Sequence, residues 1–156
     1  MNQKVLDIFL PKERSLEQLK NFSFLKKMIF EIESFFKNGE NFLFINVKED
    51  LIRNYVFHAS LNSLNTQFKI IDLEDKVFNL DDFKNPMVFI KNLSSNFLDQ
   101  ESEFFLFNGF NYCLNHNKKI LFSSNDFVKN LGIKLADLES RLSTVLPLEI
   151  LNPTGW

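Results

Sequence analysis

The sequence predicts an α/β fold in which helices cover both faces of a mainly parallel sheet, giving three layers. Short apolar runs bounded by turn residues, as buried strands require, recur at 42–45, 68–71, 87–90, 120–123 and 145–150. Longer segments with apolar residues at helical spacing stand between most of these runs. Because parallel strands need long crossovers, usually helices, this alternation favours a parallel sheet over an antiparallel one.

The first half of the chain supplies two predicted helices. One spans 16–37, with Ser15 as its N-cap and Asn38-Gly39 to end it. Its apolar positions recur every three or four residues and comprise Leu16, Leu19, Phe22, Leu25, Met28, Ile29, Ile32 and Phe36. The other spans 48–64, and its predicted inward face consists of Leu51, Tyr55, Val56 and Ala59.

The second half repeats the alternation of strand and helix. An acidic connection over 73–85 follows the second strand and contains a predicted turn of helix at 80–83. Helices are predicted over 99–115 and 135–142. The strands at 87–90, 120–123 and 145–150 complete the sheet.

Composition fits one globular domain over 15–156, preceded by an extended arm over 1–14. The chain has 156 residues, 45% of them apolar and 24% charged, with a net charge of −2. Such a charge gives no basic footprint, so we expect a protein partner rather than direct contact with nucleic acid. The single cysteine, Cys113, excludes an internal disulfide and is predicted to be a buried small hydrophobe. Without a signal peptide or membrane span, a cytoplasmic location is expected.

The loop after the first strand is where an α/β nucleotide-binding protein of the P-loop type carries G-x-x-x-x-G-K-[ST]. That motif needs glycines so that backbone N–H groups can approach phosphates, a lysine to neutralise them and a hydroxyl for magnesium. The chain instead reads Asn46-Val47-Lys48-Glu49-Asp50-Leu51-Ile52-Arg53-Asn54. After the strand at 87–90, Lys91-Asn92 stands where an Asp should order magnesium. We therefore predict a pseudo-ATPase that binds neither nucleotide cofactor nor metal.

Three segments then follow in a recognisable order and spacing. They are Leu106-Phe107-Asn108-Gly109-Phe110-Asn111, Ile120-Leu121-Phe122-Ser123-Ser124-Asn125 and Leu135-Ala136-Asp137-Leu138-Glu139-Ser140-Arg141-Leu142. They resemble the second half of the nucleotide-binding core of the bacterial replication initiator DnaA, and more closely that of its short regulatory paralogues, the Hda-like proteins. The resemblance spans most of the chain and is most specific over 103–150. It implies a P-loop NTPase-like fold, the AAA+ core.

The resemblance assigns roles to two residues. Asn125 stands where the family has a polar residue that senses the terminal phosphate; without nucleotide it is a turn residue before Asp126. Arg141 matches an arginine that reaches across a subunit boundary to a neighbour's nucleotide. Such an arginine finger raises the hydrolysis rate about 10³–10⁵-fold. The alternative is that Arg141 only pairs with Asp137, Glu139 or the last carbonyls of its helix.

The N-terminal arm resembles the sliding-clamp-binding peptide of Hda-like proteins. Gln3 would form amide hydrogen bonds, while Leu6, Ile8 and Phe9 would enter an apolar groove. Lys4 departs from the usual leucine of the family. The alternative is a tail that packs Leu6 and Ile8 on its own sheet.

In the resembled family a small helical lid follows the core, and Pro153 falls where that lid would begin. A core without its lid is therefore expected, in agreement with a lost ATP site.

The sequence supports two main functional hypotheses. The first is a non-catalytic, Hda-like adaptor that docks on DnaA, tethered to the sliding clamp, and promotes hydrolysis of DnaA-bound ATP. The second is a non-catalytic structural or scaffold subunit of a replication assembly, in which Arg141 serves only its own fold. An enzyme with an unrecognised site ranks last, because His58 and His116 lack a nucleophile or metal-ligand spacing nearby.

Overall fold

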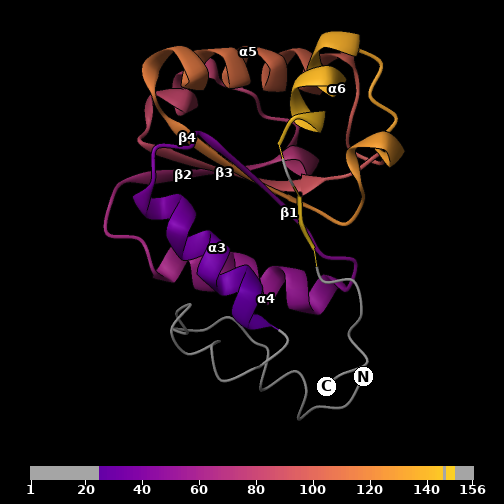
Figure 1. Cartoon of the computed structure of the whole chain (residues 1–156). Coiled ribbons are helices and arrows are strands. Elements are labelled where there is room, and N and C mark those ends of the chain that lie inside the picture. Colours follow the sequence, from indigo (N-terminus) through magenta and orange to yellow (C-terminus); the bar gives the residue numbers. More distant parts are fainter. Residues whose placement is uncertain (1–24, 146, 150–156) are drawn as a thin grey trace.

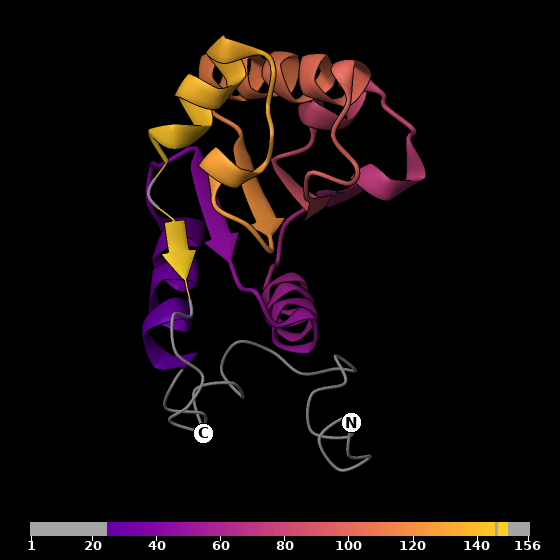
Figure 2. The same ribbon diagram turned by 90° about the vertical axis from the view of Figure 1, so that its right-hand side faces the viewer.

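The computed structural model describes residues 25–145 and 147–149. A five-stranded parallel sheet lies between two layers of helices, with α3 and α4 on one face and α5 and α6 on the other (Figures 1 and 2). The predicted three-layer α/β fold is therefore confirmed.

The described helices are α3 (Lys26–Lys37), α4 (Asp50–Asn62), α5 (Gln100–His116) and α6 (Ala136–Ser143). The strands are β1 (Phe42–Asn46), β2 (Phe68–Asp72), β3 (Met87–Leu93), β4 (Lys119–Ser124) and β5 (Pro147–Glu149). Three short 3₁₀ helices lie in the connections, namely η2 (Leu73–Asp75), η3 (Leu80–Lys84) and η4 (Val128–Asn130). The strand order across the sheet is β2-β3-β4-β1-β5, and every strand pair is parallel.

Each predicted strand is present, and the turn of helix predicted at 80–83 is η3. Two helical faces differ from the prediction by one residue, since Phe35 and Ile52 are buried while Phe36 and Leu51 only pack against the margin of the core. Adjacent residues of a helix are rotated by about 100° about its axis, so only one of two neighbouring apolar residues can face the sheet directly. Packing against the sheet determines which of the two is buried. The start of the helix predicted over 16–37, with its cap Ser15, lies outside the described residues.

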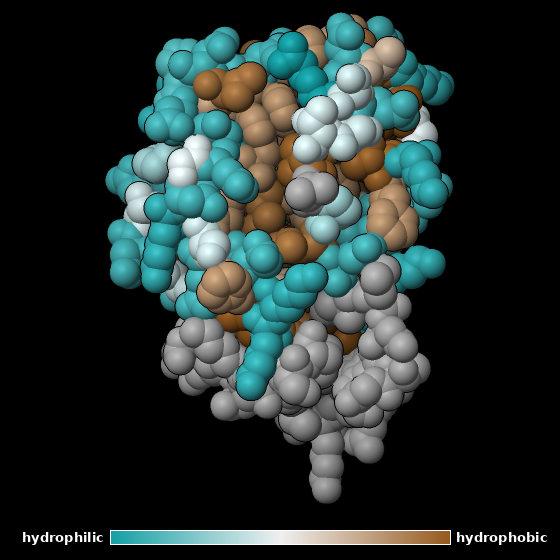
Figure 3. All heavy atoms as spheres, viewed as in Figure 1, coloured by the Kyte–Doolittle hydropathy of each residue, from teal (hydrophilic) through white to brown (hydrophobic). Residues whose placement is uncertain are grey.

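The two faces of the sheet belong to separate cores, because successive side chains of a strand point to opposite sides. Ile45 of β1 and Phe89 of β3 pack under α3 and α4. Phe44 and Phe122 pack under α5 and α6. The edge of the sheet next to β1 and β5 faces the viewer in Figure 3, where apolar side chains form a band between hydrophilic ones. No helix in 25–145 is long and apolar enough to span a bilayer.

The connection between β2 and β3 is locked onto α5 by an aromatic side chain and a glycine. Phe83 of η3 is fully buried, and its ring lies against Gly109. A Cβ added at Gly109 would stand 2.1 Å from the nearest ring carbon of Phe83. The close approach of η3 to α5 therefore requires glycine at this position.

We predict that Gly109→Ala destabilises the fold by about 1–3 kcal/mol, because overpacking outweighs the gain of about 1 kcal/mol in helix propensity. Thermal unfolding should show a fall in Tm of roughly 3–10 °C. Asn108→Ala, at the exposed neighbouring position on α5, is the matched control and should leave Tm unchanged or slightly higher. An equal Tm for Gly109→Ala and the wild type would contradict the packing described here.

Candidate functional site

The carboxyl ends of the parallel strands meet at one edge of the sheet, the usual place for ligands in α/β proteins. Among the cavities lined by the described residues, two at this edge border the ends of β1 and β4. One of about 210 Å³ is lined by Asn46, Lys48, Asn125, Asp126, Phe127, Asn130 and Glu149. The other, of about 200 Å³, lies between the start of α4 and the ends of β3 and β4. Asn125 lines both cavities, so the end of β4 borders both.

The loop between β1 and α4 is bridged by Arg53 of α4. Its guanidinium donates to the carbonyl oxygens of Val47 at 2.8 Å and Lys48 at 3.4 Å. It also donates to the Asp50 carboxylate at 2.6 Å, and only 12% of the Arg53 side chain is exposed. Of the two cations of this segment, Arg53 is therefore engaged within the loop, whereas Lys48 is exposed and lines the 210 Å³ cavity.

The start of α4 is already capped by a carboxylate. Glu49 accepts a hydrogen bond from the backbone N–H of Leu51 at 3.4 Å, in the region where helices attract anions. Asn46, at the end of β1, is buried, whereas Asn54 is exposed on α4.

This arrangement is the reverse of what phosphate groups require. A phosphate cradle presents backbone N–H groups and free positive charge, but this loop turns two carbonyl oxygens toward its arginine and adds two carboxylates. The residues present therefore do not fit the phosphates of a nucleotide.

The end of β3 differs from the prediction in length and shape, since the strand continues to Leu93 instead of stopping at 90. Its pairing with β4 shifts register between Ile90 and Leu93, and Asn92 has a left-handed φ of 62°. The Asn92 amide donates to the carboxylate of Asp72, at the end of β2, at 2.7 Å. The position expected to hold a magnesium-ordering Asp thus carries an amide that is already hydrogen-bonded to a neighbouring strand.

Asn125 lies in the bend before Asp126 that follows β4, as predicted for a turn residue, and the side chain of Ser124 closes this bend. The Ser124 hydroxyl accepts from the Asp126 backbone N–H at 3.0 Å and donates to the Leu93 carbonyl at 2.6 Å. The consecutive small polar residues at 123–126 were the available signal. Among the described residues, Asn125 Oδ1 and Ser94 Oγ are buried without a hydrogen-bond partner, and both residues line the 200 Å³ cavity.

Arg141 lies on α6 and lines neither cavity. Its guanidinium carbon stands 5.3 Å from the centre of the Phe107 ring on α5, a cation–π contact worth about 0.5–1 kcal/mol at an exposed site. Among the described residues it forms no ion pair with Asp137 or Glu139. Its contact with Phe107 was missed, because aromatic partners on another helix leave no local pattern.

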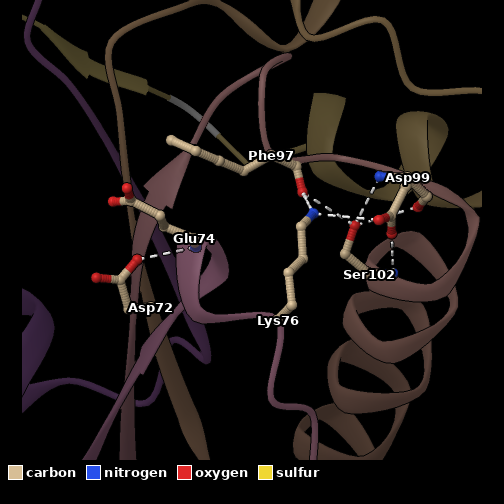
Figure 4. A network of polar contacts seen from close by, with 6 residues as sticks. All are labelled: Asp72, Glu74, Lys76, Phe97, Asp99 and Ser102. Carbon is tan, nitrogen blue, oxygen red and sulfur yellow. Dashed lines mark hydrogen bonds and ion pairs between the residues drawn. The ribbon is translucent and has the colours of Figure 1, made fainter.

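The start of α5 is fixed by a polar network, shown in Figure 4. Asp99 caps the helix by accepting from the Ser102 backbone N–H at 2.9 Å, and Ser102 Oγ accepts from the Asp99 backbone N–H at 2.8 Å. Lys76, from the β2–β3 connection, donates to Asp99 at 3.1 Å and to the carbonyl of Phe97. The Ser102 N–H and, after it, Lys76 lower the pKa of Asp99 below its ordinary value.

The remaining candidate residues are the cysteine and a histidine that could serve in catalysis, the possible metal ligands, and the arm. Burial raises the pKa of the Cys113 thiol to about 12, so this group stays protonated at neutral pH. Burial and the charge of Lys91 lower the pKa of His58. Within 25–145 and 147–149, no group of three or more His, Cys, Asp or Glu side chains is arranged to hold a metal ion. The arm residues Gln3, Leu6, Ile8 and Phe9 lie outside the described residues.

Comparison with known proteins identifies the fold. No family model matches the sequence, and no curated protein matches it at a significant level. Among solved structures, DnaI is 19% identical, with a TM-score of 0.72 over 95% of this chain and 92% of that chain. AMPPCP-bound DnaA from Aquifex aeolicus is 17% identical, with a TM-score of 0.71 over 91% of this chain and 51% of that chain. A structure described as a DNA replication initiation factor is 17% identical, with a TM-score of 0.71 over 89% and 49%.

These similarities establish the fold alone: it is the AAA+ core fold found in DnaA and DnaI. The chain spans about half the length of the Aquifex aeolicus DnaA structure and of the initiation factor.

We predict that nucleotides do not stabilise this protein. A site with micromolar affinity would add about 4 kcal/mol at millimolar Mg-ADP, equivalent to a rise in Tm of roughly 10 °C. Because Arg53 and the two carboxylates occupy the loop, thermal unfolding of the wild type should shift by less than about 1 °C. A DnaA protein measured alongside is the positive control. A saturable rise of several degrees would contradict the account of this loop.

Proposed function

We propose that the chain is a non-catalytic, Hda-like adaptor that regulates replication initiation by acting on a nucleotide held by DnaA. The similarity of its fold to DnaA and DnaI supports a place in the initiation machinery. The finer assignment, to an inactivator of DnaA, rests on the sequence resemblance over 103–150.

One observation supports the proposal above the others: the nucleotide loop is closed by its own arginine. Arg53 bonds the carbonyl oxygens of Val47 and Lys48, so that loop and helix stabilise each other without phosphate. A loop and helix that an internal cation holds together can keep the fold without a bound nucleotide and without hydrolysis. Its contribution to ATP chemistry then has to be made in a partner's site.

Arg141 is the residue through which such a contribution could be made. Its side chain is partly exposed on α6 and is not engaged in an ion pair within the described part of the chain. An arginine donated to another protein's site stabilises the charge that develops on the transferred phosphoryl group. The donor needs no phosphate site of its own, which agrees with the closed loop.

The contact between Arg141 and Phe107 also favours a second function. If Arg141 serves only to pack on the Phe107 ring and stabilise its own fold, the chain is a structural or scaffold subunit of a replication assembly. The two functions separate experimentally, since a scaffold binds its partner without changing the partner's hydrolysis rate.

The arm adds a proposal about location on the replication machinery. Gln3, Leu6, Ile8 and Phe9 are proposed to bind the sliding clamp in extended form, with the backbone and Gln3 supplying hydrogen bonds. Binding both the clamp and DnaA would raise the effective concentration of one partner near the other.

For the arm, we predict that a chain beginning at Lys12 loses affinity for the clamp while its Tm is unchanged. Lys4→Leu should tighten the complex roughly five- to tenfold by restoring an apolar contact. Lys12→Leu, which makes the same change outside the peptide, is the matched control. Calorimetric titration of the clamp measures all of them, and unchanged affinity in the shortened chain and in Lys4→Leu would remove the clamp from the proposal.

For Arg141, we predict that Arg141→Ala leaves Tm and DnaA affinity nearly unchanged but abolishes stimulation of DnaA-bound ATP hydrolysis. Arg141→Lys should restore little, because a point charge cannot reproduce the planar guanidinium fork. Single-turnover hydrolysis of ATP preloaded on DnaA measures the effect. Arg14→Lys, which makes the same change in a segment outside the described residues, is the control for loss of a guanidinium elsewhere and should retain stimulation. Binding without stimulation by the wild type would instead favour the scaffold function.

A further inference from the structure

We propose that Glu103 and Phe107, one turn apart on α5, are positioning residues that hold Arg141 in its working direction. The inference rests on the proposed function, because it concerns the geometry of the same arginine. The sequence assigned no role to either residue. Each instead contacts the segment that carries Arg141, one at the start of α6 and one near its end.

Glu103 fixes the start of α6. Its side chain is buried, with 4% exposure, although it is charged. Its carboxylate accepts from the backbone N–H of Lys134 at 3.0 Å and of Leu135 at 2.8 Å. Leu135 is the N-cap of α6 and has no side chain that could cap the helix. A carboxylate from another helix thus satisfies the N–H of the N-cap residue and of the residue before it, at the positive end of α6.

This anchor matters because α6 has only eight residues. A helix of that length is not stable alone, and its direction is set by what holds it. Leu138 and Leu142 are fully buried on its inner side, which fixes its rotation about its own axis. Glu103 fixes where the helix begins, so together these contacts determine where Arg141 leaves the backbone.

Phe107 sets the direction of the guanidinium itself. Arginine has a long side chain with many rotamers, and fixing it in solvent is entropically costly. The guanidinium carbon lies 5.3 Å from the centre of the Phe107 ring, in a cation–π contact that restricts the side chain. Among the described residues, no hydrogen bond engages the N–H donors of Arg141. The guanidinium therefore keeps its hydrogen-bonding edge available to a partner.

Polar contacts hold the start of the helix that carries both residues. The network of Lys76, Asp99 and Ser102 caps the first turn of α5, directly before Glu103. Figure 4 shows Lys76 reaching from the β2–β3 connection to this turn. Because these contacts hold α5 in place, Glu103 and Phe107 keep the same position relative to each other. Their contacts with α6 then fix the position of α6.

The test compares Phe107→Leu and Glu103→Gln with matched controls on the same helix. Phe104→Leu removes an exposed ring that contacts no other ring among the described residues, and Glu101→Gln neutralises an exposed carboxylate in the first turn. Two readouts are needed. One is the maximal rate and the half-saturating chain concentration in stimulated hydrolysis of DnaA-bound ATP. The other, independent of any partner, is the NMR shift of the Arg141 guanidinium proton, which the Phe107 ring current displaces. The chain has only three arginines, so this signal is readily assigned.

We expect Phe107→Leu to lower the maximal rate about 10–10²-fold, the scale of a misplacement near 1 Å, with the half-saturating concentration unchanged. Its Arg141 signal should move to the unshifted position, and Glu103→Gln should lower the rate in the same direction. Both controls should match the wild type in rate and in signal.

Four outcomes count against the inference. A full maximal rate in Phe107→Leu would show that Phe107 is not a positioning residue, while the proposed function would stand. A full maximal rate in Glu103→Gln would show that Glu103 is not a positioning residue. An unshifted Arg141 signal in the wild type contradicts the contact between Arg141 and Phe107 directly. Absence of stimulation by the wild type overturns the proposed function, and the inference falls with it.

Discussion

Arg53 forms the contact on which the character of this domain depends. Its guanidinium joins the end of β1 to the first turn of α4 through the carbonyl oxygens of Val47 and Lys48 and the carboxylate of Asp50. In a P-loop protein, phosphate oxygens would accept from backbone N–H groups at the same place. Here an internal cation balances backbone carbonyls. The carbonyl oxygens of Val47 and Lys48 and the carboxylate of Asp50 are therefore paired with Arg53 without a ligand. The three-layer fold is retained with this loop.

The other contacts that bear on function lie on the face of the sheet covered by α5 and α6. The seam between α5 and α6 contains a buried carboxylate, an arginine on an aromatic ring, and a capped helix start linked to the β2–β3 connection. None of these contacts touches the β1–α4 loop. Mutations at the seam and mutations at the loop should therefore act independently, since they share no partner.

The fold was predictable because strand and helix periods are local properties of the sequence. Short apolar runs such as 120–123 and helical spacing such as 99–115 survive in the structure with small changes at their ends. The missing glycines were equally visible, since a motif either has its residues or lacks them. The closure by Arg53 could not be predicted, because it depends on which way two carbonyl groups turn. The cap from Glu103 joins residues 31 and 32 positions apart, beyond any local pattern.

The central claim is that nucleotide chemistry belongs to a partner and not to this chain. Photolabelling tests it most directly: an azido-substituted ATP is equilibrated with an equimolar mixture of this protein and DnaA, irradiated, and located by peptide mapping. The account predicts label on DnaA alone, with the same yield when this protein is omitted or when Arg53 is replaced by alanine. Specific label on residues 46–54 of this chain, competed by unlabelled ATP, would contradict it.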